Sequence, residues 1–134
     1  LRFVYPVHRN PQVLEPVQRL LGGLEHVLLT EPLEYPVMAQ LLGRAWMILT
    51  DSGGIQEEAT SLGKPTLVLR EVTERPEGLE AGVLRLTGTD ARRIRLGIDD
   101  LMADSRIYAS MAKPSLAFGD GRAAQRIVRA LIGI

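Results

Sequence analysis

A short turn of one serine and two glycines is the part of the sequence best suited to bind an anion. Ser52, Gly53 and Gly54 follow an apolar segment and open a stretch of helical period. Backbone N–H groups at such a helix start can face an anion, and the missing Cβ atoms let a diphosphate approach closely. The alternative is structural, with Asp51 or Ser52 merely capping the helix.

Two adjacent glutamates, Glu57 and Glu58, lie early in the same expected helix. Carboxylates are favoured near a helix N-terminus even without a ligand, so a structural role is one interpretation. A carboxylate one turn beyond a phosphate-binding N-terminus can also accept hydrogen bonds from ribose hydroxyls. Because neighbouring helical residues point about 100° apart, we expect at most one of the two to do so.

A second polar turn, at residues 73–77, carries one arginine, Arg75, with Pro76 stiffening the backbone beside it. A guanidinium binds phosphate bidentately, and a fixed backbone lowers the cost of ordering the side chain. The turn follows the next strand after the glycine turn, which favours a ligand-binding role for Arg75. A solvated loop with a local ion pair is the alternative.

The two histidines lie in different settings. His8 follows the first apolar segment, where an imidazole can contact an anion, exchange a proton near neutral pH or simply fix its loop. His26 introduces a strand and is expected at the surface. Neither has the spacing of a metal-ligand cluster, so we expect no metal and no cofactor.

Short apolar segments alternate with segments of helical period, which predicts an α/β fold with parallel strands and crossover helices. Ligands bind at the carboxyl ends of the strands in such a sheet, where both polar turns and His8 fall. Residues 71–78 are expected to form a loop. Strands are expected at residues 3–7, 26–29, 46–49, 65–69 and 83–86, and helices at 11–21, 34–44, 52–62, 91–102, 106–112 and 122–131.

The composition limits the possible partners. A chain of 134 residues, 46% hydrophobic, is expected to make one domain. Sixteen basic and sixteen acidic residues give no overall field for nucleic acid or a membrane surface, so an anion site must be local. The absence of cysteine excludes disulfides and thiolate catalysis, and a cytoplasmic location is the expectation. Because the chain begins without Met in a strand-like segment, we expect it to be a fragment.

Seven blocks of the sequence resemble, in order and spacing, the non-hydrolysing bacterial UDP-N-acetylglucosamine 2-epimerases. The resemblance extends over essentially all 134 residues. The blocks are YPVHxNP at 5–11, LTDSGGIQEEA at 49–59, LGKP at 62–65, TERPEG at 73–78, EAG at 80–82, GTD at 88–90 and GDG at 119–121. One block departs from the family, because residues 116–121 read LAFGDG where members commonly have NPYGDG.

The resemblance implies a two-domain fold of the glycosyltransferase-B type, about three times as long as this chain. Residues 1–134 would be its UDP-binding C-terminal domain, Rossmann-like, with a parallel sheet and flanking helices but without its first strand and helix. The family interconverts UDP-N-acetylglucosamine and UDP-N-acetylmannosamine, by elimination and re-addition of UDP, for cell-envelope polysaccharides. Its acid and base groups would lie outside this chain, which is expected to hold no catalytic residue and to be inactive alone. The full-length enzyme is expected to be a homodimer.

The resemblance also assigns site residues. Ser52, Gly53 and Gly54 would hold the diphosphate of UDP or UDP-N-acetylglucosamine, Glu58 the ribose, and Arg75 would contact the ligand from the facing loop. Leu33 and Met38 would lie on the uracil side, and His8 near a second, regulatory nucleotide. Two other functions are compatible with this pattern, the donor-binding half of a glycosyltransferase and a non-catalytic nucleotide-binding fragment.

Overall fold

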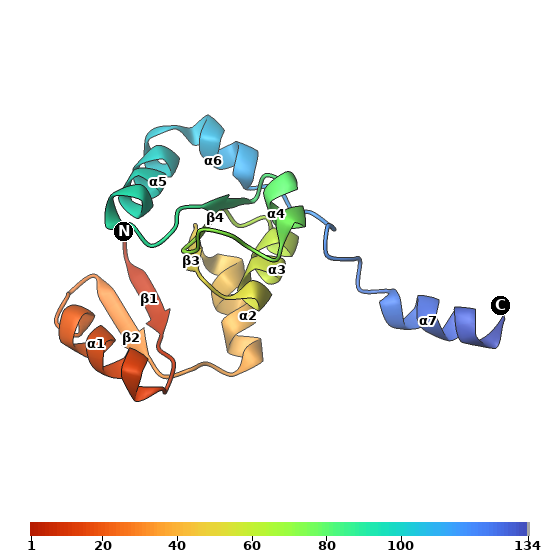
Figure 1. Ribbon diagram of the computed structural model, residues 1–134, viewed down its shortest axis with the longest axis horizontal. Helices are drawn as coiled ribbons and strands as arrows, with labels where there is room; N and C mark the ends of the chain where they lie inside the picture. Colours follow the sequence, from red (N-terminus) through yellow and green to blue (C-terminus); the bar gives the residue numbers. More distant parts are fainter. Residues whose placement is uncertain (134) are drawn as a thin grey trace. The chain divides into compact units, whose positions relative to one another are not determined.

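The computed structural model describes residues 1–133, and these separate into two compact units (Figure 1). The first unit covers Leu1–Leu41 and the second begins at Leu42. All pairs of strands in both units are parallel, as the alternating pattern predicts. The assignment of residues 1–134 to one UDP-binding domain stays a prediction.

The first unit is built on a parallel pair of strands, β1 (Phe3–Pro6) and β2 (Val27–Thr30), joined by helix α1 (Pro11–Leu21). Helix α1 begins where the sequence predicts it, because the Asn10 side chain accepts from the Gln12 N–H at 3.0 Å and proline suits the first helical position. Helix α2 (Tyr35–Arg44) starts in this unit and extends into the next.

The second unit contains a three-stranded parallel sheet in the order β3 (Ile48–Thr50), β4 (Thr66–Val68), β5 (Leu84–Leu86). Helices follow the strands along the chain, so the carboxyl end of each strand leads into a polar loop or a helix start. The helices are α3 (Gly53–Leu62), α4 (Pro76–Glu80), α5 (Ala91–Ala103), α6 (Ser105–Met111) and α7 (Ala123–Ile132).

The central strand β4 is buried on both of its faces. Leu67 points to the side where α5 and α6 contribute Leu101 and Met111 to a buried cluster. Its neighbours Thr66 and Val68 point the opposite way, because side chains alternate along a strand, and they too have no exposed surface. Both faces of the sheet are therefore covered at β4, as is usual for a central strand of a parallel sheet.

Two predicted element boundaries are wrong. Trp46 was expected within the third strand, but β3 begins at Ile48, and the indole stacks on Tyr108 with ring centroids 4.7 Å apart. The Tyr108 hydroxyl donates to the Trp46 carbonyl at 2.9 Å, so this backbone oxygen bonds to a side chain rather than to a neighbouring strand. The loop expected at residues 71–78 becomes helical from Pro76, whose ring favours the first position of a helix.

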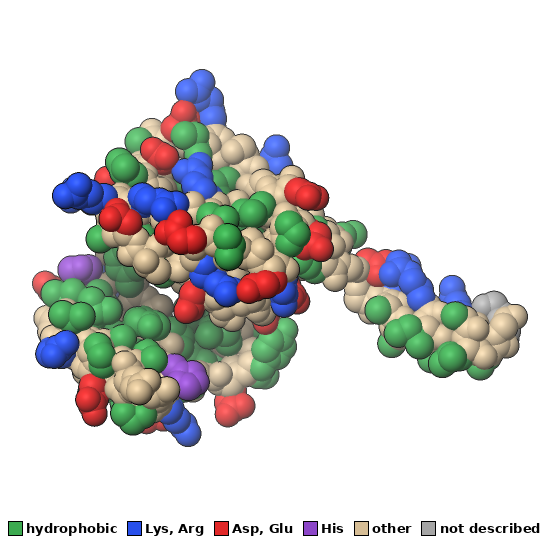
Figure 2. All heavy atoms as spheres, viewed as in Figure 1, with side chains coloured by type: hydrophobic (Ala, Val, Ile, Leu, Met, Phe, Trp, Pro, Cys, Tyr) green, Lys and Arg blue, Asp and Glu red, His purple; other side chains and the backbone are tan. Residues whose placement is uncertain are grey.

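Helix α7 is exposed along its whole length. Its apolar side chains Ile127, Val128, Leu131 and Ile132 are 53–80% exposed. In Figure 2, hydrophobic side chains gather along one side of this helix and basic side chains along another. Among the described residues, no helix is both long enough and apolar enough to cross a membrane.

We predict that Gly63→Ala destabilises the second unit more than Gly82→Ala does. Both glycines have left-handed φ values, 63° and 74°, which cost an L-residue roughly 1–2 kcal/mol. A Cβ at Gly63 would also lie 2.4 Å from the backbone nitrogen of Pro114, whereas one at Gly82 meets nothing within 4 Å. Urea unfolding should show an additional loss of about 1–3 kcal/mol for Gly63→Ala. Equal losses would contradict the packing argument.

Candidate functional site

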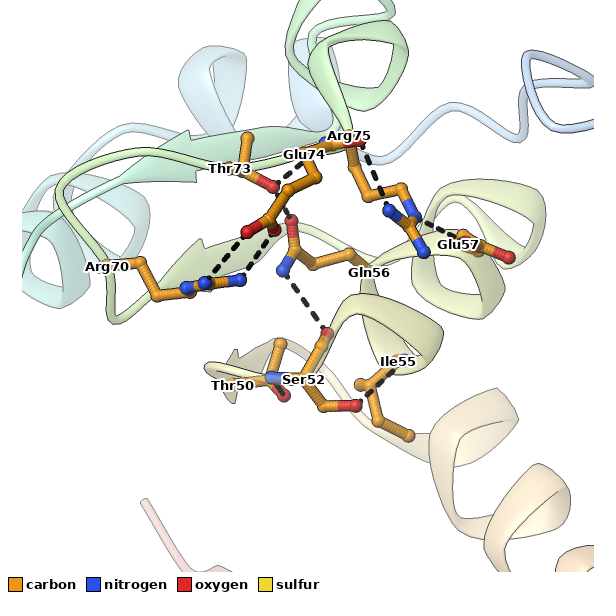
Figure 3. A network of polar contacts seen from close by, with 9 residues as sticks. All are labelled: Thr50, Ser52, Ile55, Gln56, Glu57, Arg70, Thr73, Glu74 and Arg75. Atoms are coloured by element: carbon orange, nitrogen blue, oxygen red, sulfur yellow. Dashed lines mark hydrogen bonds and ion pairs between the residues drawn. The ribbon is translucent and has the colours of Figure 1, made fainter.

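The start of α3 leaves two backbone N–H groups available to a ligand. Ser52 caps the helix, with its hydroxyl accepting from the Ile55 N–H at 3.5 Å (Figure 3). The Ser52 N–H itself donates to Thr50 Oγ1 at 3.1 Å. The first N–H groups of a helix have no acceptor within the helix, so the Gly53 and Gly54 groups remain. The Ser52 N–H group was also expected to face an anion, but it already donates to the Thr50 hydroxyl.

The structure brings Arg75 to this helix start. A Cβ built on Gly53 would lie 3.4 Å from Arg75 Nη2, so the guanidinium lies directly beside the first glycine. Around Gly54 a Cβ would meet nothing within 4 Å, which leaves open space on that side. The two polar turns predicted from the sequence therefore form one site, with a guanidinium and two glycine N–H groups close together.

The Arg75 guanidinium is held by two neighbours. Its Nε donates to the Glu57 carboxylate, and its Nη1 donates to the Glu74 carbonyl at 3.2 Å. The Nη2 group is the one that lies beside Gly53. The ion pair is not the local one weighed from the sequence, because Glu57 lies on α3, 18 residues from Arg75. It occurs together with the approach of the guanidinium to the glycine turn. Glu57 and Arg75 are both part-exposed, so the pair contributes little to folding by itself.

Glu58 is the other member of the glutamate pair, and it is half-buried. Within residues 1–133 its carboxylate belongs to none of the ion pairs, in contrast to that of Glu57. The two carboxylates lie in different surroundings because neighbouring residues point in different directions from α3. The assignment of Glu58 to the ribose stays a prediction.

Two site residues escaped prediction from the sequence, Gln56 and Thr73. The Gln56 side chain is fully buried, donates to the Ser52 carbonyl at 3.2 Å and accepts from Thr73 Oγ1 at 2.5 Å. Thr73 Oγ1 in turn accepts from the Arg75 N–H at 3.1 Å. A polar residue on the buried side of a helix is the signal that could have pointed to Gln56, since such a group needs partners.

A second ion pair braces the loop that carries Arg75. Arg70 donates two hydrogen bonds to Glu74, at 2.7 and 3.0 Å. Hydrogen bonding from its own backbone N–H, and then from Arg70, lowers the pKa of the Glu74 carboxyl below its ordinary value. The pair connects the two ends of the loop between β4 and Arg75.

The remaining predicted site residues belong to the first unit. His8 is exposed, and its Nδ1 accepts from the Asn10 N–H at 3.1 Å, so it fixes the loop before α1. Leu33 precedes α2 and Met38 lies within it, both half-buried. A groove of about 530 Å³ opens where β1 and β2 end, and Arg9 and Glu31 are among the residues that line it. The assignments of Leu33, Met38 and His8 stay predictions.

The block that departs from the family, at residues 116–121, contains a glycine turn before α7. Gly119 and Gly121 both have positive φ values, 111° and 75°. Asp120 between them accepts from the Arg122 N–H at 3.1 Å and from the Arg126 side chain at 2.6 and 3.0 Å. These bonds, the backbone one first, lower the pKa of the Asp120 carboxyl. Asp120 thus connects this turn to the start of α7.

Comparisons with known proteins agree on one family. A sequence model described as UDP-N-acetylglucosamine 2-epimerase matches residues 1–132. The Salmonella typhimurium UDP-N-acetylglucosamine 2-epimerase is 53% identical over 98% of this chain and 35% of its own length. The crystal structure of the Neisseria meningitidis UDP-GlcNAc 2-epimerase bound to UDP-GlcNAc superposes with a TM-score of 0.95 at 43% identity, covering 100% of this chain and 36% of that one. The Staphylococcus aureus MnaA structure with UDP gives 0.92 at 46% identity, over 98% of this chain and 36% of that one.

The chain spans about a third of the length of these relatives. Its α/β architecture of parallel strands and flanking helices is that of a Rossmann-like half of the glycosyltransferase-B type, as the resemblance implied. Family match, sequence identity and structural similarity extend over nearly every residue. The chain therefore belongs to the UDP-N-acetylglucosamine 2-epimerase family.

Proposed function

We propose that this chain is the UDP-binding part of an enzyme that interconverts UDP-N-acetylglucosamine and UDP-N-acetylmannosamine. The observation that carries the proposal is the Arg75 guanidinium beside the Gly53–Gly54 helix start. A cation and two backbone donors converge there on one small space, which suits a diphosphate. Relatives solved with UDP-GlcNAc or with UDP support the choice of nucleotide.

In the proposed complex the Gly53 and Gly54 N–H groups donate to the diphosphate, and Arg75 Nη2 donates from the facing loop. The dipole of α3 adds about 0.3–1 kcal/mol at such a helix end. Ser52 acts mainly by capping α3 and fixing the turn, because its N–H and hydroxyl already have partners. Glu58 accepts from the ribose hydroxyls.

The proposed contribution to catalysis is electrostatic. When the bond between sugar and UDP breaks, negative charge develops on the departing diphosphate. Donors that are already oriented stabilise that charge without reorganising, and this raises the rate of bond breaking. The proton-transfer groups belong to the part of the enzyme outside this chain, so the chain alone binds UDP without turnover. The homodimer and the cytoplasmic location stay predictions.

We predict that Gly54→Ala weakens UDP binding while it stabilises the fold. An alanine at this helical position meets nothing within 4 Å and restricts the unfolded chain, which stabilises by about 0.5–1 kcal/mol. Its methyl group would occupy the space that the diphosphate needs, and we expect calorimetry to show at least a roughly tenfold rise in Kd, equivalent to about 1.4 kcal/mol. Gly43→Ala, in α2 with equally open surroundings, is the control. Unchanged affinity in Gly54→Ala would contradict the placement of the diphosphate.

We also predict that Arg75→Gln raises the Kd for UDP by roughly tenfold to a hundredfold. The variant loses a charge-assisted contact to phosphate, which contributes about 1.5–3 kcal/mol. Arg92→Gln is the matched control, because it removes the same charge from an exposed position on α5. Equal effects of both variants in calorimetry would show that net charge matters rather than a contact by Arg75.

The activity is tested with the full-length protein that contains this segment. Incubated with UDP-N-acetylglucosamine and no acceptor, it is expected to form UDP-N-acetylmannosamine, detected by proton NMR of the sugar anomeric signals. Release of UDP that depends on an added acceptor would instead identify a glycosyltransferase. The 134-residue chain by itself should leave the substrate unchanged while still binding UDP.

A further inference from the structure

A continuous chain of hydrogen bonds joins the two halves of the proposed diphosphate site. It runs from the Ser52 carbonyl to the Gln56 side chain, from there to the Thr73 hydroxyl, and ends at the Arg75 N–H (Figure 3). The Ser52 carbonyl belongs to the glycine turn, and the Arg75 N–H belongs to the loop after β4. The Gln56–Thr73 contact therefore connects segments that are 17 residues apart.

We propose that Gln56 and Thr73 are positioning residues that set where the Arg75 guanidinium lies relative to the glycine N–H groups. Neither side chain contacts the nucleotide in this proposal, which rests on the proposed function. Affinity for the diphosphate then depends on both residues, although the ligand touches only the groups that they hold.

The burial of Gln56 makes the connection rigid. Its side chain has no exposed surface, so water cannot replace a partner that moves away. Its backbone carbonyl also accepts from Thr60 Oγ1 at 2.8 Å, which fixes the residue within α3. A displacement of the Thr73 loop would leave the Gln56 side-chain oxygen buried without its donor, and this penalty holds the loop in place.

The geometry of Arg75 explains why a small displacement matters. Its backbone is tied to Thr73, and its guanidinium is tied to Glu57 and to the Glu74 carbonyl. The Nη2 group reaches Gly53 only because all these contacts hold at once. Binding groups act together when they are held within about 0.5 Å of the productive arrangement. Loss of the Thr73 hydroxyl removes the contact that sets the backbone position.

A positioning role and a purely structural role predict different losses of affinity for ligands with and without phosphate. If Thr73 acts through Arg75, its loss weakens the binding of UDP but leaves that of uridine nearly unchanged, because uridine has no phosphate for Arg75 to contact. If Thr73 merely supports the fold, UDP and uridine lose affinity in the same proportion. Thr73→Ser retains the hydroxyl and should retain the position.

The test measures UDP binding by calorimetry and uridine binding by NMR titration, with the 134-residue chain and its Thr73→Val and Thr73→Ser variants. We expect Thr73→Val to raise the Kd for UDP by about tenfold or more, the effect of one charge-assisted hydrogen bond. The Kd for uridine should change less than about twofold, and Thr73→Ser should bind UDP within about threefold of the unchanged chain. Thr89→Val makes the same chemical change at an exposed position outside this network and is the control.

If Thr73→Val fails to fold, Gln56→Met replaces it, because methionine fills the buried space without offering either hydrogen bond. Unchanged UDP affinity in a folded Thr73→Val or Gln56→Met variant would overturn the positioning role and leave the proposed function intact. Equal losses for UDP and uridine would overturn it as well. Absence of UDP binding by the folded, unchanged chain would overturn the proposed function and this inference together.

Discussion

The burial of β4 on both faces is the constraint on which the site depends. Because β3 and β4 are parallel neighbours, their carboxyl ends lie at the same edge of the sheet. The glycine turn follows one of these ends and the Arg75 loop follows the other. A strand that was free to slip would carry the loop with it, but Thr66, Leu67 and Val68 are all enclosed. Packing of the sheet thus fixes the separation of the two segments of the proposed site to a first approximation, and polar contacts refine it.

The polar groups buried around this strand are threonines and one glutamine, and they have hydrogen-bond partners. The hydroxyls of Thr60, Thr66 and Thr87 donate to backbone carbonyls, and Thr50 accepts from the Ser52 N–H. Within the described residues, no buried side-chain nitrogen or oxygen lacks a hydrogen-bond partner. A core that includes polar groups of fixed direction specifies one arrangement more strictly than apolar contact does. That strictness suits a site whose parts come from separate loops.

Prediction from the sequence succeeded where structure is determined by local chemistry. Helices α1 and α5 begin at the predicted residues, where Asn10 and Asp90 cap them, and α3 ends as predicted before Gly63, which is left-handed. Such effects need only neighbouring residues. Trp46 fell outside its predicted strand because a distant residue, Tyr108, holds its ring and its carbonyl. Two further contacts could not be predicted, the one between Gln56 and Thr73 and the ion pair between Glu57 and Arg75. Both depend on how separate segments meet in three dimensions.

The ion pair between Glu57 and Arg75 has a consequence for selectivity. Since the Glu57 carboxylate already accompanies the Arg75 guanidinium, the pair has little net charge and attracts small anions such as chloride only weakly. A ligand gains substantially when it has enough oxygen atoms to reach the guanidinium and both glycine N–H groups at once. For the proposed diphosphate site, discrimination then rests on the spacing of the donors rather than on their total charge.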